Sequence, residues 1–251
     1  MKEKKQKLTE LEILEKMNNM SESEKAEFRQ KNKEHDEIIA KRTVRNPISR
    51  FIKRCVDIAG GLVGCIILVP VTVIAFGMKI AFREKGPVFY TQNRIGINGK
   101  IFKIHKFRSM VVGAEDILQK YLDENPEAAE EYKKNKKLRC DPRITKTGYF
   151  LRRTSLDEWP QFIEILTGKM SLVGPRPYLE SEKEDMGEYY EYIIKVKPGL
   201  TGPWQIAGRS NLDFNDRLKL DEEYASRCGN RRDFAILFKT VAKVFKKEGA
   251  I

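Results

Sequence analysis

Two adjacent carboxylates, Asp157 and Glu158, carry the clearest chemical signal in the sequence. Arginines precede and follow this pair at Arg152, Arg153 and Arg176. Chemistry on a phosphate needs an oxygen nucleophile, oxygen ligands for a hard divalent cation, and planar cations that hold phosphoryl oxygens. The stretch supplies all three, so its residues suggest phosphate-transfer chemistry.

Helix capping is the alternative explanation for the two carboxylates. Pro160 fits only the first turn of a helix, so a helix is expected to begin near residues 155–157. Ser155 and Glu158 then have capping-box spacing, and Asp157 could itself be an N-cap. However, a helix N-terminus also favours phosphate, and capping does not require the neighbouring arginines. We therefore favour catalysis.

Further cations could bind the phosphates of a substrate. Arg176 lies between Pro175 and Pro177, which restrict the backbone around it and suit a fixed bidentate contact. Lys106 and Arg108 are one residue apart, so on a strand they would share a face. A stiff loop and solvated surface charge are the simpler explanations of these two features. Because the carboxylate pair is also present, we expect Arg176 and the Lys106–Arg108 pair to face a phosphate.

Composition narrows the range of partners. The chain has 251 residues, a formal net charge of +12 and a pI near 9.4, which predict an anionic partner: nucleic acid, an acidic membrane surface or a phosphorylated substrate. The 4 cysteines are scattered and form no Cys-x-x-Cys pair, which indicates reduced thiols in a cytosol-facing protein. Two histidines, His35 and His105, are poor material for a zinc site or a Ser/His/Asp triad. Catalysis is therefore expected to depend on carboxylates, arginines and lysines.

A long apolar run indicates where this chemistry occurs. Residues 58–78 are uncharged, and as a straight helix they would span about 30 Å, the thickness of a bilayer core. Basic residues flank the run: Arg50, Lys53 and Arg54 before it, and Lys79, Arg83 and Lys85 after it. Because positive residues tend to stay cytoplasmic, both ends are expected on the same side. The run therefore favours a membrane helix that returns to the side it entered from.

Pro70 is where this helix is expected to break. Proline removes a backbone hydrogen bond and bends a helix. The preceding Val69 cannot donate to the carbonyl that the kink frees, although Thr72 could compensate. We therefore predict a re-entrant helical hairpin. A simple span and a buried core helix are the alternatives.

The chain beyond the apolar run is expected to be α/β, a helix-rich mixture of α and β elements. Strand-like alternation occurs at 87–92 and 101–104, with a turn signal at 96–99 between them. A polar surface helix is expected over 115–137, and a rigid loop over 198–203. These elements are expected to form the domain that carries the site.

The two ends of the chain are both expected to be helical. The N-terminal part lacks Gly and Pro and is typical of a solvated extension, with a self-association helix as the alternative. Residues 233–247 form a basic amphipathic helix, which suits a membrane interface or packing against the core. The expected organisation is a charged helical extension (1–47), a re-entrant membrane helix (48–85) and a cytosolic catalytic domain (86–251).

Residues 48–250 resemble the bacterial sugar transferase family, the monotopic polyprenyl-phosphate phosphoglycosyl transferases. The matching blocks are Lys53–Asp57, Gly86–Phe89, Gln92–Gly96, Lys106–Met110, Asp141–Thr145, Ser155–Glu158, Ser171–Pro177 and Lys197–Gly202. So many blocks in order make the match specific, and only the N-terminal extension lies outside it.

The resemblance implies a reaction. Such enzymes move a sugar 1-phosphate from a UDP-sugar onto undecaprenyl phosphate and release UMP, which primes exopolysaccharide, capsule or glycoconjugate assembly. Asp157 would be the nucleophile that forms a covalent aspartyl-phosphosugar intermediate, and Asp157 and Glu158 would hold Mg²⁺. Arg152 and Arg176 match family positions for phosphate or nucleotide binding. Pro177, with Lys106 and Arg108, would complete the substrate site.

The resemblance also implies a location and partners. The protein would be monotopic on the cytoplasmic face of the bacterial inner membrane, with interfacial amphipathic helices around the catalytic domain. Its partners would be a UDP-sugar, undecaprenyl phosphate and membrane lipids, without nucleic acid, and a homo-oligomer is compatible with this arrangement. Two other classes remain as alternatives. A membrane-anchored nucleic-acid-binding protein is supported by net charge alone, and an intact carboxylate pair argues against an inactive scaffold.

Overall fold

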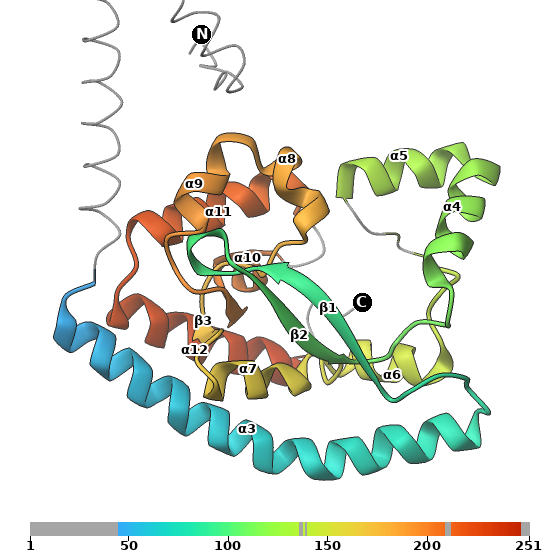
Figure 1. Cartoon of the computed structure of the whole chain (residues 1–251), viewed down its shortest axis with the longest axis horizontal. Helices are drawn as coiled ribbons and strands as arrows, with labels where there is room; N and C mark the ends of the chain where they lie inside the picture. Colours follow the sequence, from blue (N-terminus) through green and yellow to red (C-terminus); the bar gives the residue numbers. More distant parts are fainter. Residues whose placement is uncertain (1–44, 136–137, 139, 209–211, 247–251) are drawn as a thin grey trace, which may run out of the picture.

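A long helix, α3 (Pro47–Ala81), runs along one edge of the molecule, and the other described elements all lie on one side of this helix (Figure 1). The computed structural model describes residues 45–135, 138, 140–208 and 212–246. The predictions for the N-terminal extension lie outside the described residues, apart from the start of α3. The described part is helix-rich and contains two small sheets, in agreement with the mixed α/β prediction.

The sequence around α3 explains both its start and its two faces. Asn46 caps the helix by accepting the amide of Ser49 at 2.7 Å, and Pro47 occupies the first turn. One face is buried at helical spacing: Asp57, Gly61, Gly64, Leu68, Val71, Ala75 and Lys79. The opposite face leaves large apolar side chains exposed, among them Ile66 at 70% and Val73 at 67%. Among the described residues, α3 is the one helix long and apolar enough to cross a membrane.

The helix contains Pro70 and does not break there. The predicted hairpin of two separate helices is not formed, because α3 remains one helix from Pro47 to Ala81 and changes direction near its middle (Figure 1). A proline removes a single ladder hydrogen bond, which is enough for a bend. The carbonyl that loses its partner is that of Ile66, whereas Thr72 Oγ1 donates to the Leu68 carbonyl at 2.7 Å. The predicted compensation by Thr72 therefore acts on a different carbonyl.

Glycines let α3 approach α7 (Phe162–Leu166) closely. A Cβ atom on Gly64 would lie 2.2 Å from the ring of Phe162, and one on Gly61 would lie 2.7 Å from Leu166 Cδ2. Any larger residue at Gly64 would have to displace an aromatic ring in a packed interior, which is costly. These two positions bring the short helix that follows the carboxylates directly onto α3.

Polar contacts tie both ends of α3 to the same body of the protein. Toward its N-terminus, the guanidinium of Arg54 donates to the carbonyls of Ile165 and Leu166 at 2.8 and 2.7 Å. Just beyond its C-terminus, Glu84 Oε1 accepts the amide of Thr147 at 2.9 Å. Because buried polar groups need partners, these contacts hold α3 against the domain over most of its length.

An antiparallel hairpin leads toward the carboxylates. It pairs β1 (Phe89–Ile95) with β2 (Ile101–Phe107), and the turn includes Asn98 and Gly99 in left-handed conformations with φ of 55° and 74°. The predicted strands and turn are confirmed. The predicted loop over 198–203 is partly wrong, because β4 (Gly199–Thr201) lies within it.

The second sheet is short and brings distant segments together. β4 pairs in parallel with β3 (Ser171–Val173), with Ser171 opposite Gly199. On the α3 side of β3, Asp57 Oδ1 accepts Ser171 Oγ and the Leu172 amide, both at 2.9 Å. The strand before the Pro-Arg-Pro turn is thereby attached to α3.

The predicted surface helix over 115–137 is two helices, α4 (Ala114–Glu124) and α5 (Pro126–Asn135). Asn125 between them is extended, as expected for a residue before proline. The other long elements are α6 (Lys146–Arg153), α10 (Pro203–Ala207), α11 (Phe214–Ser226) and α12 (Asn230–Lys246). The shorter ones are η1 (Ile97–Gly99), η2 (Trp159–Gln161), η3 (Glu180–Glu182), α8 (Lys183–Met186), η4 (Gly187–Tyr189) and α9 (Tyr190–Ile193).

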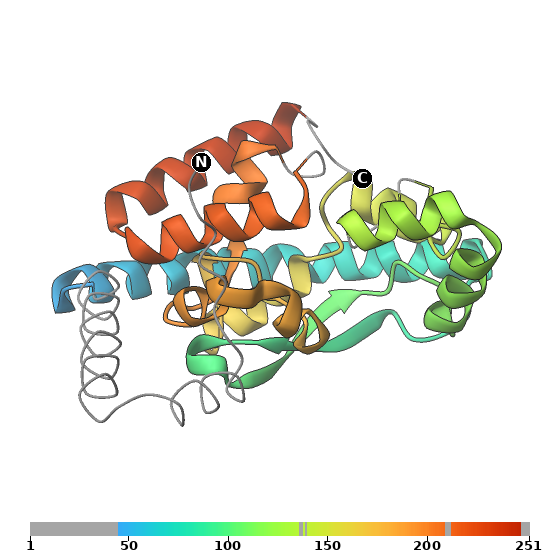
Figure 2. The same cartoon turned by 90° about the horizontal axis from the view of Figure 1, so that it is seen from above.

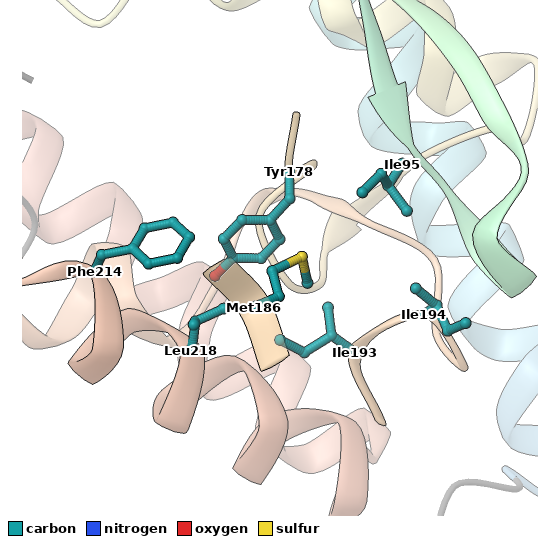
Figure 3. Packing of buried hydrophobic residues seen from close by; sticks show 7 residues of the cluster. All are labelled: Ile95, Tyr178, Met186, Ile193, Ile194, Phe214 and Leu218. Atoms are coloured by element: carbon teal, nitrogen blue, oxygen red, sulfur yellow. The ribbon is translucent and has the colours of Figure 1, made fainter. Parts of the chain in front are cut away.

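A hydrophobic cluster fixes the chain after the Pro-Arg-Pro turn. Figure 3 shows Tyr178 among side chains of β1, α8, α9 and α11. Its ring meets that of Phe214 edge-on, with centroids 5.9 Å apart. Tyr178 and Met186 are each only 1% exposed. Arg176 is therefore held close to a rigid part of the core.

The C-terminal amphipathic helix fits parts of both predictions made for it. α11 and α12 lie on the side opposite the β-hairpin (Figure 2). Ile236 of α12 is buried against Val173 and Tyr224, so one face packs on the core. Phe238 of the same helix remains 75% exposed. An apolar stripe is thus left for a further surface, which suits a membrane interface.

Candidate active site

The carboxylate pair, Asp157 and Glu158, lies in the connection between α6 and η2. After α6 ends at Arg153, Ser155 adopts a left-handed backbone with φ of 56°. The amide of Phe107, the last residue of β2, donates to the Asp157 carbonyl at 2.9 Å. The predicted helix begins later than expected, at Trp159, because the left-handed residue turns the chain first. The pair is therefore fixed beside the end of the hairpin.

Glu158 forms an ion pair and does not cap the helix. It immediately precedes η2 but makes no side-chain capping hydrogen bond. Its Oε1 instead accepts from Lys106 Nζ at 2.6 Å, and the Glu158 side chain stays 41% exposed. Lys106 thus lies at the carboxylate pair, while its predicted role in binding substrate stays a prediction. The capping-box explanation is wrong for Glu158.

The pKa values of the two carboxyl groups are displaced in opposite directions. Burial and the charge of Glu158 raise the pKa of Asp157 to about 6, although Lys106 and Arg152 act against this shift. Burial also acts to raise the pKa of Glu158, but Lys106 and two arginines hold it below its usual value. At neutral pH, Asp157 is therefore mainly ionised yet weakly stabilised, which suits a nucleophile.

Arg152 and Arg108 occupy different places around the pair. Arg152 Nε donates to Ser109 Oγ at 3.0 Å, and the charge of Arg152 lowers the pKa of Asp157. Arg153, on the same turn, is exposed. Arg108 Nε donates to the Pro87 carbonyl at 3.1 Å, so this cation contacts the start of the hairpin. The predicted Lys106–Arg108 pair thus diverges: one cation binds the carboxylate pair, and the other lies beside β1.

Asp221 of α11 holds the Pro-Arg-Pro turn in place through two hydrogen bonds. Asp221 Oδ2 accepts the Arg176 amide at 2.9 Å and the Tyr178 hydroxyl at 2.8 Å. The Pro177 carbonyl accepts Arg94 Nη1 at 2.9 Å. Arg176 and Pro177 therefore belong to one network with Arg94, and Arg176 is among the cations that lower the pKa of Glu158.

Sequence reasoning missed Arg94, which is only 5% exposed. Burial and the charge of Arg176 lower the pKa of Arg94 to about 10, while Glu182 and Glu158 oppose the shift. Its block, Gln92–Gly96, is part of the family resemblance, but the residue types in that block do not indicate that this arginine is buried. The alternation of faces along β1 is the one signal that could have indicated it, because it places Arg94 on the same face of the strand as Gln92.

Trp204 of α10 completes this side of the site and was also missed. The guanidinium carbons of Arg176 and Arg217 lie 5.8 and 5.5 Å from its ring centroid. Several buried polar atoms here have no hydrogen-bond partner among the described residues: Arg94 Nε, Arg176 Nε, Trp204 Nε1, Gln205 Oε1 and Asp221 Oδ1. Because buried polar atoms are usually paired, the three N–H donors among them suit an anionic ligand.

The carboxylate pair also fits a divalent cation. Among the described residues, no cluster of three or more His, Cys, Asp or Glu side chains could form an all-protein metal site. Mg²⁺, however, is usually bound by one or two carboxylates together with substrate phosphates and water. Two partly exposed carboxylates beside the cations Lys106, Arg94 and Arg176 are compatible with that donor set.

Known proteins are similar in sequence to most of this chain. The family model described as "Bacterial sugar transferase" matches residues 48–247. The chain is 42% identical over 202 residues to the "Undecaprenyl-phosphate galactose phosphotransferase" of Salmonella typhimurium, covering 80% of this chain and 42% of that relative. Against the "Exopolysaccharide production protein ExoY" of Sinorhizobium fredii it is 39% identical over 204 residues, covering 81% of this chain and 90% of that relative.

A third relative is the "UDP-glucose:undecaprenyl-phosphate glucose-1-phosphate transferase" of Escherichia coli, 40% identical over 212 residues. The match covers 81% of this chain and 42% of that relative. The chain therefore spans less than half the length of several relatives that it matches and most of the length of the ExoY protein.

Asp221, which holds the Pro-Arg-Pro turn, should make the free energy of unfolding depend on pH. Burial raises the pKa of Asp221 to about 7, although its hydrogen bonds oppose the shift. In the unfolded chain an aspartate titrates near about 4, so between these values the folded protein keeps a proton that the unfolded chain has lost. Wild-type stability should therefore fall as pH rises through this window, by up to roughly 1 kcal/mol per pH unit.

Asp221→Asn removes this titration, because the asparagine resembles the protonated acid. Unfolding in detergent should show the variant gaining stability relative to wild type from about pH 5 to about pH 7. A difference that is constant with pH would show that Asp221 is ionised throughout and would contradict the assignment.

Proposed function

The chain belongs to the bacterial sugar transferase family, and on this premise we propose that it is a phosphoglycosyl transferase. It transfers a sugar 1-phosphate from a UDP-sugar to undecaprenyl phosphate and releases UMP. The observation that carries this proposal is the carboxylate pair with divergent pKa values, placed between a group of cations and an apolar helix. The relatives named above for galactose or glucose phosphate transfer support the substrate class.

The first step transfers the sugar phosphate to the protein. The ionised Asp157 carboxylate attacks the β-phosphorus of the UDP-sugar, and the bond between that phosphorus and the bridging oxygen breaks. UMP leaves with the electron pair, and an aspartyl-phosphosugar remains. Lys106 and Arg152, whose charges act on Asp157, are placed to stabilise charge on the phosphoryl oxygens.

The second step passes the sugar phosphate to the lipid. A phosphate oxygen of undecaprenyl phosphate attacks the same phosphorus, and the Asp157 carboxylate leaves. A covalent intermediate lets one anionic product depart before the second anion enters the same group of cations. The reaction therefore needs one site, used twice, and predicts ping-pong kinetics.

The nucleotide of the donor would bind beside Arg94, Arg176 and Trp204. Arg94 and Arg176 both act on Glu158, and Trp204 lies against Arg176. Their unpaired polar atoms would be satisfied by phosphate oxygens and by the uridine of the donor. Mg²⁺ held by Asp157 and Glu158 would neutralise charge on the diphosphate and assist the departure of UMP.

We further propose that α3 lies in the cytoplasmic leaflet of the inner membrane, with both of its ends facing the cytosol. The contacts of Arg54 and Glu84 tie the two ends to one domain, which could not lie on both sides of a bilayer. The exposed apolar face of α3 then contacts lipid, and the bend near the middle of the helix brings the chain back to the surface. This arrangement is re-entrant without requiring two separate helices.

Cysteine labelling tests this topology. In a cysteine-free background, Arg50→Cys and Arg83→Cys place thiols before and after the apolar run. Both should react with a membrane-impermeant maleimide only when the cytosolic side is opened, because both ends lie there. Labelling of one of them from the outer side of intact spheroplasts would instead establish a simple span.

Release of UMP tests the reaction. Purified protein in detergent, with Mg²⁺ and undecaprenyl phosphate, should release UMP from at least one member of a panel of UDP-sugars. Asp157→Asn should lower this rate by at least about a thousandfold, since a nucleophile is lost and other groups in the site cannot replace it. Asp116→Asn, at an exposed carboxylate on α4, should keep the wild-type rate.

Two outcomes would reject the proposal. Full activity of Asp157→Asn would show that another group attacks the donor. Absence of UMP release from every UDP-sugar by folded wild-type protein would favour a scaffold role instead.

A further inference from the structure

An apolar groove follows α3 at its bend. Its walls are α3 side chains between Cys65 and Phe76, together with Val88 and Phe89 at the start of the hairpin. Its volume is about 680 Å³, within the range of about 300–1,000 Å³ usual for ligand pockets. The Thr72 hydroxyl in this wall is already bonded to the Leu68 carbonyl. The groove therefore offers an almost wholly apolar surface to a ligand.

Two stacked aromatic rings connect the groove wall to the segment that carries the carboxylate pair. Phe89, in its wall, stacks on Phe107 with ring centroids 5.3 Å apart. Phe107 in turn donates its amide to the Asp157 carbonyl. Val88, also in the wall, packs in the same cluster as Leu156 and Trp159, which flank the pair in sequence. The groove therefore lies beside the segment that carries Asp157.

Charge at this end of the groove favours a phosphate. The Arg108 amide donates to the Val88 carbonyl at 2.7 Å, and Arg108 Nε donates to the Pro87 carbonyl at 3.1 Å. This cation therefore lies next to the residues at the start of the hairpin that line the groove. Lys106, which forms the ion pair with Glu158, precedes Arg108 by two residues. An apolar channel with cations at one end matches an amphiphile with a long hydrocarbon chain and an anionic head.

We propose that this groove binds the isoprene units next to the phosphate of the polyprenyl acceptor, and that Arg108 contacts that phosphate. The inference rests on the proposed function and adds the acceptor's binding site to it. Arg108 then has a role distinct from that of Lys106: it positions the second substrate, whereas Lys106 acts on the carboxylate pair.

Two matched substitutions on α3 test the groove. Val73→Trp fills it, whereas Val63→Trp adds the same bulk at another exposed valine of α3 that does not line it. Val73→Trp should raise KM for undecaprenyl phosphate at least about tenfold, because about 1.4 kcal/mol of binding corresponds to that factor. It should leave the donor half-reaction, exchange of labelled UMP into UDP-sugar without lipid, at the wild-type rate. Val63→Trp should change neither quantity.

Equal effects of the two substitutions on KM would overturn the proposal, since the groove would then hold bulk lipid only. Loss of UMP exchange in wild type would instead count against the proposed function, independently of the groove.

Native thiols on α3 provide a second measurement that does not depend on turnover. Cys65 lines the groove, whereas Cys55 is exposed elsewhere on the same helix. In variants that retain only one of them, undecaprenyl phosphate should slow maleimide labelling of Cys65 several-fold and leave Cys55 unchanged. Phosphatidylglycerol at the same concentration should protect neither. An unprotected Cys65, or equal protection by phosphatidylglycerol, would refute a specific acceptor site.

Discussion

The ion pair between Lys106 and Glu158 gives two neighbouring carboxylates different electrostatic environments. At 2.6 Å, the ammonium group satisfies Glu158 and keeps it ionised, while Asp157 stays in a desolvated position beside that fixed negative charge. Two titratable groups with environments that separate their pKa values are a common basis for dividing catalytic roles. The arrangement depends on the hairpin, because Lys106 reaches Glu158 only if β2 ends beside the connection between α6 and η2.

In the proposed function, α3 determines where the carboxylate chemistry takes place. Its inner face carries small residues and a few polar anchors, so that α7 and β3 pack closely against it. Its outer face carries large exposed apolar residues. In a monotopic arrangement, the depth of α3 in the lipid would set the height of Asp157 relative to lipid phosphates. The exposed stripe on α12 and the groove at the bend extend the same apolar surface.

The sequence predicted those features that depend on local pattern. The uncharged run over 58–78 indicated the central part of α3, which extends further at both ends, and the alternating residues around Gly96–Gly99 predicted the hairpin. The capping explanation for Glu158 failed because a cation from β2, distant in sequence, binds the carboxylate more directly than the helix amides do. The break at Pro70 was overestimated, since packing along the inner face keeps both halves of α3 in one helix.

Residues that act through tertiary contacts were not predictable in this way. Asp221 supports Arg176 from a helix 45 residues further along the chain, and no local pattern connects them. Arg94 and Trp204 join the site only after β1 and α10 have been placed against the Pro-Arg-Pro turn. Their single-residue signals resemble those of ordinary strand and loop positions, so only the folded structure distinguishes them.

Peptide mass spectrometry after incubation with the donor alone tests the central claim most directly. With a UDP-sugar and Mg²⁺ but no lipid, the account predicts that the peptide containing Asp157 gains the mass of one sugar phosphate, and that undecaprenyl phosphate then removes it. An adduct on a different side chain, or no adduct in a preparation that turns over fully once lipid is added, would contradict it.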